Sequence, residues 1–163
     1  MKIFSKKNNI RKSAGFMVVE VLIATSIIAA SVLAATAVAQ KSINVSRQAL
    51  HSLQASFLLE EGAEVMRILR DNSWSTFVDA NYGTPYGLVF SSSQWTLSGS
   101  SSTTGIFTRR ITFYTVERDA VTGDIISTGG LSNTDTVLLV IEVTWNEGGQ
   151  SITKNLSLYL NDI

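Results

Sequence analysis

The chain has 163 residues with 13 basic and 13 acidic side chains, a formal net charge of zero, one histidine and no cysteine. This length allows one modest domain whose core needs neither a disulfide nor a metal. Because cysteine, a second histidine and a phosphate-binding glycine motif are missing from the sequence, neither an enzyme nor a bound cofactor is expected.

The charge is distributed unevenly along the chain. Residues 1–15 contain five basic side chains and no acidic one, whereas residues 16–163 contain the other eight basic and all thirteen acidic side chains. In the 24 residues from Phe16 to Ala39, Glu20 is the only ionisable side chain. Roughly 20 apolar residues are enough to cross a bilayer, and basic residues before a span remain in the cytoplasm. The sequence therefore predicts one membrane span with an exported remainder, rather than a nucleic-acid-binding arm.

Glu20 is the unusual feature of this span. A carboxylate at the centre of a membrane helix costs about 2.5–3.5 kcal/mol, so it marks a function or a partner unless it reaches the headgroups. Two ordinary explanations of this N-terminus are open. A secretory signal would be cut after Ala39, but the apolar run is long for such a signal and Glu20 interrupts it. An uncleaved anchor fits the length and leaves Glu20 without a purpose.

The helical pattern continues beyond the span to about Arg70, and residues 41–70 are expected to be amphipathic. A glycine inside a helix costs about 1 kcal/mol relative to alanine, so Gly62 is expected to mark a bend or a close approach. The single histidine, His51, is expected at the surface. The apolar stripe predicted to meet a partner consists of Ile43, Leu50, Leu53, Phe57, Val65, Ile68 and Leu69, and the predicted solvated face of Glu60, Glu61, Glu64, Arg67 and Arg70.

The remainder, residues 71–163, has the alternating pattern of β-strands. Three strands are predicted at about residues 108–117, 135–145 and 151–160, with a hairpin loop at residues 146–149. A sheet with one apolar face and a helix with one apolar stripe bury these surfaces by packing together, which predicts an α+β head. The inward-facing residues are predicted to be Ile111, Phe113 and Thr115, then Val137, Leu139, Ile141, Val143 and Trp145, then Ile152, Leu156, Leu158 and Leu160.

Two loops are candidates for binding. The Ser/Thr-rich segment Ser91–Gly105 is predicted to be a flexible connection, with an adhesive or sugar-facing loop around Trp95 as the alternative. Asp119 and Asp124 flank a turn and are considered as calcium ligands, although the spacing of an EF-hand is absent.

The segment "GFMVVEVLIA" resembles the cleavage and methylation motif of type IV prepilins and type II secretion pseudopilins. In that family a basic leader ends in glycine, here Gly15, the mature chain begins with phenylalanine, here Phe16, and its fifth residue is glutamate, here Glu20. The resemblance implies that a membrane prepilin peptidase cuts between Gly15 and Phe16 and that the new amine of Phe16 is methylated. It also implies that Glu20 pairs with the N-terminal amine of a neighbouring subunit.

The resemblance implies a domain plan, partners and a location as well. The plan is a leader of residues 1–15, a transmembrane and assembly half-helix of residues 16–40, an amphipathic half-helix of residues 41–70 and a pilin-like β-sheet head of residues 71–163. The partners are other pilin or pseudopilin subunits, the peptidase/methylase and an inner-membrane assembly platform. The precursor would lie in the cytoplasmic membrane, with its leader in the cytoplasm, and the assembled subunit in a pilus or pseudopilus at the cell surface or in the periplasm.

The sequence departs from the family pattern in three places. Met17 replaces the commoner threonine, the helix lacks the proline found about twenty residues into many pilins, and the pair of C-terminal cysteines is missing. The regions after the helix and near the end resemble small pilins and pseudopilins, which are often minor subunits. The rival hypothesis is a single-span, membrane-anchored binding module facing away from the cytoplasm. Such a module would keep residues 1–15, whereas a pilin would lose them.

Overall fold

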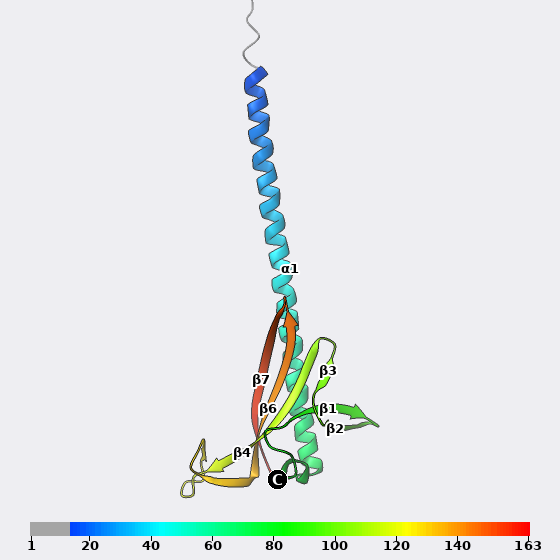
Figure 1. Cartoon of the computed structure of the whole chain (residues 1–163), viewed down its shortest axis with the longest axis vertical. Coiled ribbons are helices and arrows are strands. Elements are labelled where there is room, and N and C mark those ends of the chain that lie inside the picture. The colour runs from blue at the N-terminus through cyan, green and yellow to red at the C-terminus, as the bar shows by residue number, and fades with distance from the viewer. Residues whose placement is uncertain (1–13) are drawn as a thin grey trace, which may run out of the picture. The chain divides into compact units, whose positions relative to one another are not determined.

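The computed structural model describes residues 14–163, except the side chains of Ala14, Gly15 and Val78 (Figure 1). Most of the predicted leader, residues 1–13, lies outside the described residues. The chain divides into two compact units, Met1–Arg47 and Gln48–Ile163. Helix α1, Ala14–Asn72, belongs to both units and ends two residues later than predicted.

The second unit contains one antiparallel sheet. Seven strands form it within residues 14–163, in the order β2-β1-β4-β6-β7, with β3 and β5 each paired to β4. A short helix, α2 (Ser75–Val78), lies between α1 and the sheet in the sequence. The strands are β1 (Pro85–Ser91), β2 (Gln94–Ser98), β3 (Ser102–Thr104), β4 (Phe107–Arg118), β5 (Ile125–Ile126), β6 (Leu131–Glu147) and β7 (Gln150–Asn161).

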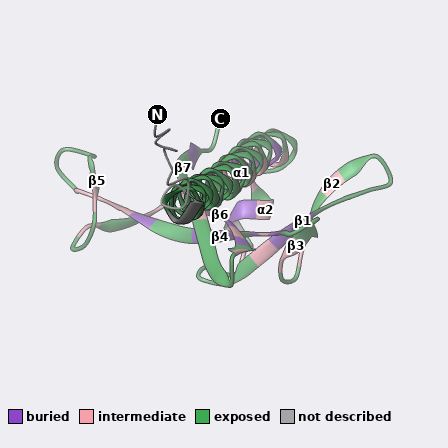
Figure 2. Ribbon diagram, turned by 90° about the horizontal axis from the view of Figure 1, so that it is seen from above, coloured by how far each residue is buried: buried purple, intermediate pink, exposed green. Residues whose placement is uncertain are grey.

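The second half of α1 lies against one face of this sheet, which confirms the predicted α+β architecture (Figure 2). The helix contributes two alanines beside three larger side chains, whereas the sheet contributes valine, isoleucine, leucine and aromatic side chains. The alternation predicted from Val137 to Trp145 in β6 is confirmed, because all five predicted inward residues are buried. The core includes Ala55, Leu59, Ala63, Val65 and Met66 from the helix, Ile111 and Phe113 from β4, and Val137, Leu139, Ile141, Val143 and Trp145 from β6.

The predicted apolar stripe of the helix was largely wrong. Of its seven residues only Val65 is fully buried, and Leu69 is partly buried against the core. The physical reason is that α1 carries two apolar faces in this region, and the face with the smaller side chains approaches the sheet. The face with the bulky side chains stays exposed; its members are Ile43, Leu50, Leu53, Phe57 and Ile68.

Gly62 marks a close approach of the helix to the sheet, one of its two predicted roles. A Cβ atom at this position would lie 3.2 Å from Cγ2 of Ile141 and 3.5 Å from Cδ of Arg109. The contact with Ile141 would be tighter than ordinary van der Waals packing, whereas the contact with Arg109 would be an ordinary one. The absence of a side chain therefore sets how closely α1 can lie on β4 and β6.

Strand β4 changes face near its end. Its register with β6 shifts between Thr115 and Val116, so that Val116 pairs with Asn133 rather than continuing the earlier pairing. A bulge of this kind places the next residue on the opposite face. Val116 is accordingly buried and Thr115 exposed, which corrects the prediction that Thr115 faces the core.

Two hairpins differ from their predicted loops. The segment Ser91–Gly105 was predicted to be a flexible connection, but β2 and β3 lie within it. The hairpin predicted at residues 146–149 is tighter, since β6 runs to Glu147 and β7 starts at Gln150. Gly148 and Gly149 both have positive φ angles, 58° and 86°, as a two-residue hairpin turn with matching twist requires.

We predict that Gly62→Leu destabilises the head by about 1–3 kcal/mol, because the new side chain forces Ile141 and the neighbouring backbone apart. The measurement is chemical unfolding of the full chain in lipid nanodiscs, followed by tryptophan fluorescence. Glu60→Leu, at an exposed position of the same helix, is the control and is expected to stay near the wild-type midpoint. Equal midpoints for Gly62→Leu and the control would contradict a tight contact at this position.

Candidate functional site

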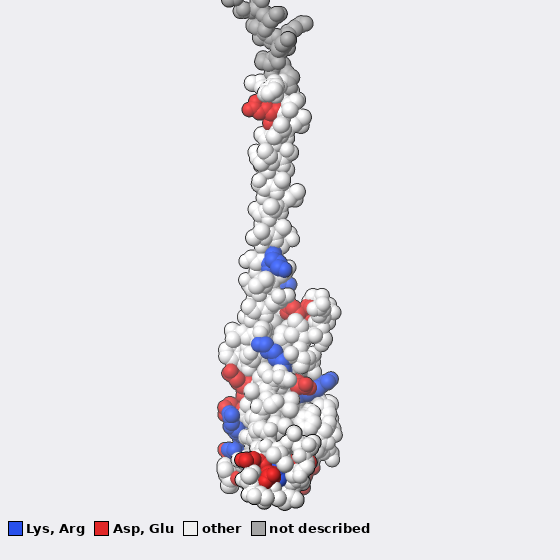
Figure 3. Space-filling view, turned by 90° about the vertical axis from the view of Figure 1, so that its left-hand side faces the viewer, with Lys and Arg blue, Asp and Glu red and all other residues white. Residues whose placement is uncertain are grey.

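The residues singled out in the sequence lie at the beginning of α1. Gly15 and Phe16 are in its first turn, and the side chain of Phe16 is 79% exposed. Glu20 is exposed one turn later, and no ion pair or hydrogen bond joins its carboxylate to another described residue. Figure 3 shows acidic atoms near the start of the described helix and then a long uncharged stretch. The first turn has no intrahelical partners for its N–H groups, so the Gly15–Phe16 bond lies where a helix opens most readily.

The other polar side chains of this segment are satisfied within the helix itself. Hydroxyl groups donate hydrogen bonds to backbone carbonyl oxygens three or four residues earlier. A helix with such internal bonds can enter an apolar environment without unpaired donors. Glu20 is thus left as the one side chain between Phe16 and Ala39 that requires an external partner. The bonds run from Thr25 to Val21 at 2.9 Å, Ser26 to Ile23 at 2.7 Å, Ser31 to Ile27 at 2.8 Å and Thr36 to Leu33 at 2.9 Å.

Among the described residues, one helix is long and apolar enough to cross a membrane, and it begins at Phe16. No residue in the most apolar stretch of this helix is buried against the rest of the chain. The segment is therefore compatible with a membrane anchor, as its composition predicted.

A buried arginine joins the second half of α1 to the sheet. Arg109 of β4 is only 5% exposed, and its guanidinium donates hydrogen bonds to the carbonyl oxygen of Leu58 at 3.0 Å and to Glu61 at 3.1 Å. Glu61 was predicted to belong to a solvated face, yet its carboxylate compensates this buried charge. Two other members of that predicted face, Glu64 and Arg67, pair with each other on the helix surface.

A second polar contact lies nearer the middle of the chain's long helix. Nδ1 of His51 is 2.5 Å from Oε2 of Glu147, and the indole N–H of Trp145 donates to the same oxygen at 3.2 Å. His51 is part-buried and packs edge-on against Phe107. The prediction that His51 is a surface residue was therefore wrong, because the end of β6 reaches the helix and covers it.

Sequence analysis missed the sheet residues that make these contacts. Three ionisable residues are an even number of positions away from the inward-facing apolar residues of their own strands, and therefore belong to the same face of the sheet. They are Arg109, Glu147 and Lys154. Lys154 donates from β7 to the carbonyl oxygen of Ser52 and to the hydroxyl of Ser56, each at 3.2 Å. An ionisable residue at an inward position was the signal that could have identified them, since such a charge needs a partner on the opposing helix.

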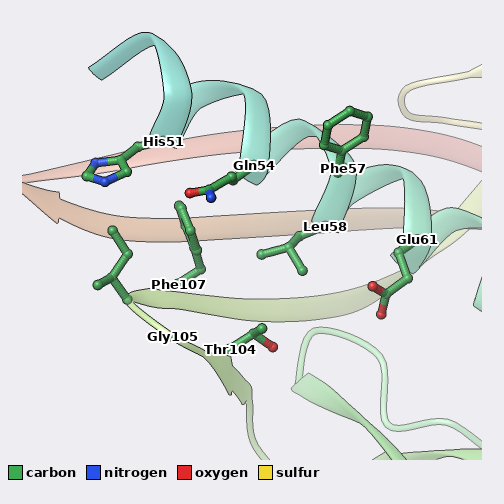
Figure 4. A pocket seen from close by; sticks show the side chains of 9 residues that line it. His51, Gln54, Phe57, Leu58, Glu61, Thr104, Gly105 and Phe107 are labelled. Atoms are coloured by element: carbon green, nitrogen blue, oxygen red, sulfur yellow. The ribbon is translucent and has the colours of Figure 1, made fainter. Parts of the chain in front are cut away.

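A groove runs along α1 beside the β3–β4 turn (Figure 4). Its volume is about 490 Å³, and Leu58 and Glu61 point from α1 toward the β3–β4 side, whereas Phe57 lies on the other side of the helix in this view. Each side contributes a largely exposed apolar side chain, since Phe57 of α1 is 59% exposed and Ile106 of the β3–β4 turn is 52% exposed. The groove thus continues the exposed apolar face of the helix. Its lining residues are His51, Gln54, Phe57, Leu58, Glu61, Thr104, Gly105, Ile106 and Phe107.

The turn considered for calcium is organised by its own backbone. Oδ1 of Asp119 accepts the N–H groups of Val121 at 2.8 Å and Thr122 at 2.9 Å, and these bonds lower the pKa of the carboxyl from its usual 3.8. One carboxylate oxygen is thereby used in holding the turn. Across residues 14–163 no three histidine, cysteine, aspartate or glutamate side chains come together as a metal site.

Comparison with known proteins gives no relative for this chain. No family model matches it, and neither the curated proteins nor the solved structures contain a significant match.

We predict that Glu147→Ala lowers the free energy of unfolding by about 1–3 kcal/mol, because two part-buried donors, on His51 and Trp145, lose their acceptor. Glu147→Gln, which keeps an acceptor oxygen, is expected to cost less. Glu142→Ala on the other face of β6 is the control. Thermal unfolding followed by near-ultraviolet circular dichroism provides the comparison, and equal losses at positions 142 and 147 would contradict the anchoring role.

We also predict a pH dependence of the Asp119 turn. Because the folded-state pKa lies below the unfolded value, the carboxylate stabilises the turn above the unfolded pKa, and this contribution disappears as the pH falls through the folded pKa. An NMR titration of the side-chain carboxyl carbon should have its midpoint below 3.8. The amide signals of Val121 and Thr122 should shift with the same midpoint, and in Asp119→Asn this transition should vanish. A midpoint at or above 3.8 would contradict the hydrogen-bonded turn.

Proposed function

We propose that this chain is a structural subunit, of the minor pilin or pseudopilin kind, of a type IV pilus-like filament. The precursor is cut between Gly15 and Phe16, methylated on the amine of Phe16 and assembled through its N-terminal helix. The observation that carries this proposal is Glu20, a carboxylate with no partner among the described residues, in an apolar segment from Phe16 to Ala39 whose hydroxyl groups are all bonded internally.

Cleavage would supply the partner that Glu20 lacks. A cut after Gly15 creates a cationic amine on Phe16, four residues or about 6 Å along the helix axis from Glu20. Residues four apart lie on the same face of a helix, so the amine and the carboxylate share one side of the chain. Parallel helices of neighbouring subunits that are offset along their axes can then bring one carboxylate beside the other's amine. Each charge resists burial alone, so the arrangement in which they meet is favoured over other offsets between the helices.

The exposed face of α1 supports assembly by the same helix. Leu50, Leu53 and Phe57 are each more than half exposed although the adjacent face of the helix packs on the sheet. Large apolar faces of this kind mark interaction surfaces. Here we assign the helix of a neighbouring subunit as the occupant, because this face continues the apolar character of the preceding segment toward the head.

The remaining parts of the proposal concern where these events occur. The precursor lies in the cytoplasmic membrane as a single-pass protein with its head outside the cytoplasm. The prepilin peptidase/methylase processes it, and an inner-membrane assembly platform inserts it among other pilin or pseudopilin subunits. The product is a filament at the cell surface or in the periplasm, in which the head is presented by the helix.

We predict that Glu20→Ala reduces the amount of this protein in sheared filaments by about tenfold, equivalent to about 1.4 kcal/mol of assembly free energy. The membrane-associated amount should stay equal or rise, because removing the carboxylate favours insertion. Quantitative immunoblots of the sheared and membrane fractions from the native host provide the measurement. Ser31→Ala, which removes an internally bonded hydroxyl from the same segment, is the matched control and should assemble normally.

The same membrane fractions test the processing step through the intact mass and N-terminal residue. The expected chain begins with methylated Phe16 in the wild type and in both variants. A chain beginning at Gln40 would instead indicate a secreted domain, and one beginning at Met1 a plain membrane anchor. Normal incorporation of Glu20→Ala into filaments would overturn the proposed role of the carboxylate even if processing is correct.

A further inference from the structure

A second cavity lies at the other end of the helix-packed unit, where the last turn of α1 meets the β1–β2 hairpin. Its volume is about 370 Å³, within the range of about 300–1,000 Å³ that is typical of small-molecule sites. The β1–β2 hairpin projects from the sheet, and β2 is an edge strand of the sheet because it pairs only with β1 (Figure 2). The cavity is lined by Ile68, Leu69, Asn72, Ser93, Gln94 and Trp95.

The lining has a specific chemical character. It combines one indole ring with two carboxamides, one hydroxyl and two aliphatic side chains, and none of these six side chains is charged. Within the part of the chain that the structure describes, the carboxamides of Asn72 and Gln94 and the indole N–H of Trp95 have no protein hydrogen-bond partner. Each carboxamide can donate and accept, and the indole can donate. The cavity therefore offers unused hydrogen-bonding groups beside an aromatic surface.

The hairpin that supplies three of these residues has a tight turn. Ser92 and Ser93 have φ angles of 53° and 63°, and positive values at both positions are what a two-residue turn between β1 and β2 requires. Here the tip is held by Phe90 and Trp95, which pair across the hairpin with ring centroids 5.1 Å apart.

The base of the hairpin is held equally firmly. Trp95 and Leu97 pack against the core, so β2 is fixed to the head although it lies at the end of the sheet. Gly87 in β1 approaches the β2–β3 connection so closely that a Cβ atom would lie 2.4 Å from the carbonyl carbon of Ser101. The walls of the cavity are thus positioned before any ligand arrives, which lowers the entropic cost of binding.

We propose that this cavity binds a neutral sugar ring. A pyranose has a face of C–H groups and an edge of hydroxyl groups, and the lining provides the complement of both: an aromatic ring for the face, and carboxamides and an indole N–H for the hydroxyls. The absence of charged lining residues favours a neutral sugar over a uronic or sialic acid, because a carboxylate would be desolvated without a cation. This inference does not depend on filament assembly, since every lining residue belongs to a single chain.

The test is a ligand titration of the unassembled full chain in phosphatidylcholine nanodiscs, which contain no sugar headgroup. The probes are the methyl β-glycosides of galactose, glucose and N-acetylglucosamine, with methyl β-glucuronide as the charged comparison. The signal is the indole N–H resonance of Trp95 in a ¹H–¹⁵N spectrum, with the resonances of Trp74 and Trp145 as internal references. At least one neutral glycoside is expected to shift the Trp95 signal saturably, with a Kd at least tenfold lower than that of the glucuronide.

Variants of the exposed carboxamides keep the test independent of folding. Asn72→Ala and Gln94→Ala are each expected to weaken binding about fivefold, equivalent to about 1 kcal/mol for a lost hydrogen bond. Gln150→Ala, which removes an exposed carboxamide at the distant β6–β7 hairpin, should bind as the wild type does. Failure of all three neutral glycosides to shift Trp95 would overturn the proposal. Equal binding of the glucuronide, or equal affinities in all three variants, would also overturn it.

Discussion

The close packing of α1 on β4 and β6 at Gly62 is the constraint on which the rest of the head depends. A Cβ atom at this position would already crowd Ile141, so the helix must present its small face, including Ala55 and Ala63, to the sheet. Near Gly62 the larger core side chains then come from the strands, including Ile141, while the bulky helix residues Leu50 and Phe57 are turned outward. One missing side chain therefore determines both what is buried and which apolar surface is left for a partner.

Much of the fold could be predicted from the sequence, because apolar and polar residues alternate along a strand that has one buried face. All five inward residues of β6, from Val137 to Trp145, were identified in this way. The same reasoning failed at Thr115, since a bulge changes the face without changing the local pattern. The same reasoning failed more broadly on the helix, which has two apolar faces. By hydrophobicity, the face rich in leucine would be chosen as the buried one, whereas close packing on the sheet favours the face with alanine. Sequence periodicity carries no information about the distance between the helix and the sheet.

The candidate sites divide in a similar way. Glu20 was found from the sequence because a charge in an apolar run is conspicuous against its neighbours. His51 was misplaced, since its surroundings come from Glu147, which lies 96 residues away in the sequence. The cavity beside Trp95 could not be located from the sequence, because its lining comes from two separate segments that only the fold brings together. A site that depends on neighbouring residues in the sequence could thus be predicted, whereas a site that depends on contacts between distant segments required the three-dimensional structure.

The internal hydrogen bonds of Thr25, Ser26, Ser31 and Thr36 have a consequence for the motion of the anchor. With its hydroxyl groups already bonded to its own backbone, the segment between Phe16 and Ala39 has one side chain, Glu20, that distinguishes one side of the helix from the others by charge. In a bilayer, lipid would therefore provide little to fix the rotation of this segment about its own axis. A single electrostatic contact to Glu20 would then be the interaction that selects one rotational orientation of the segment.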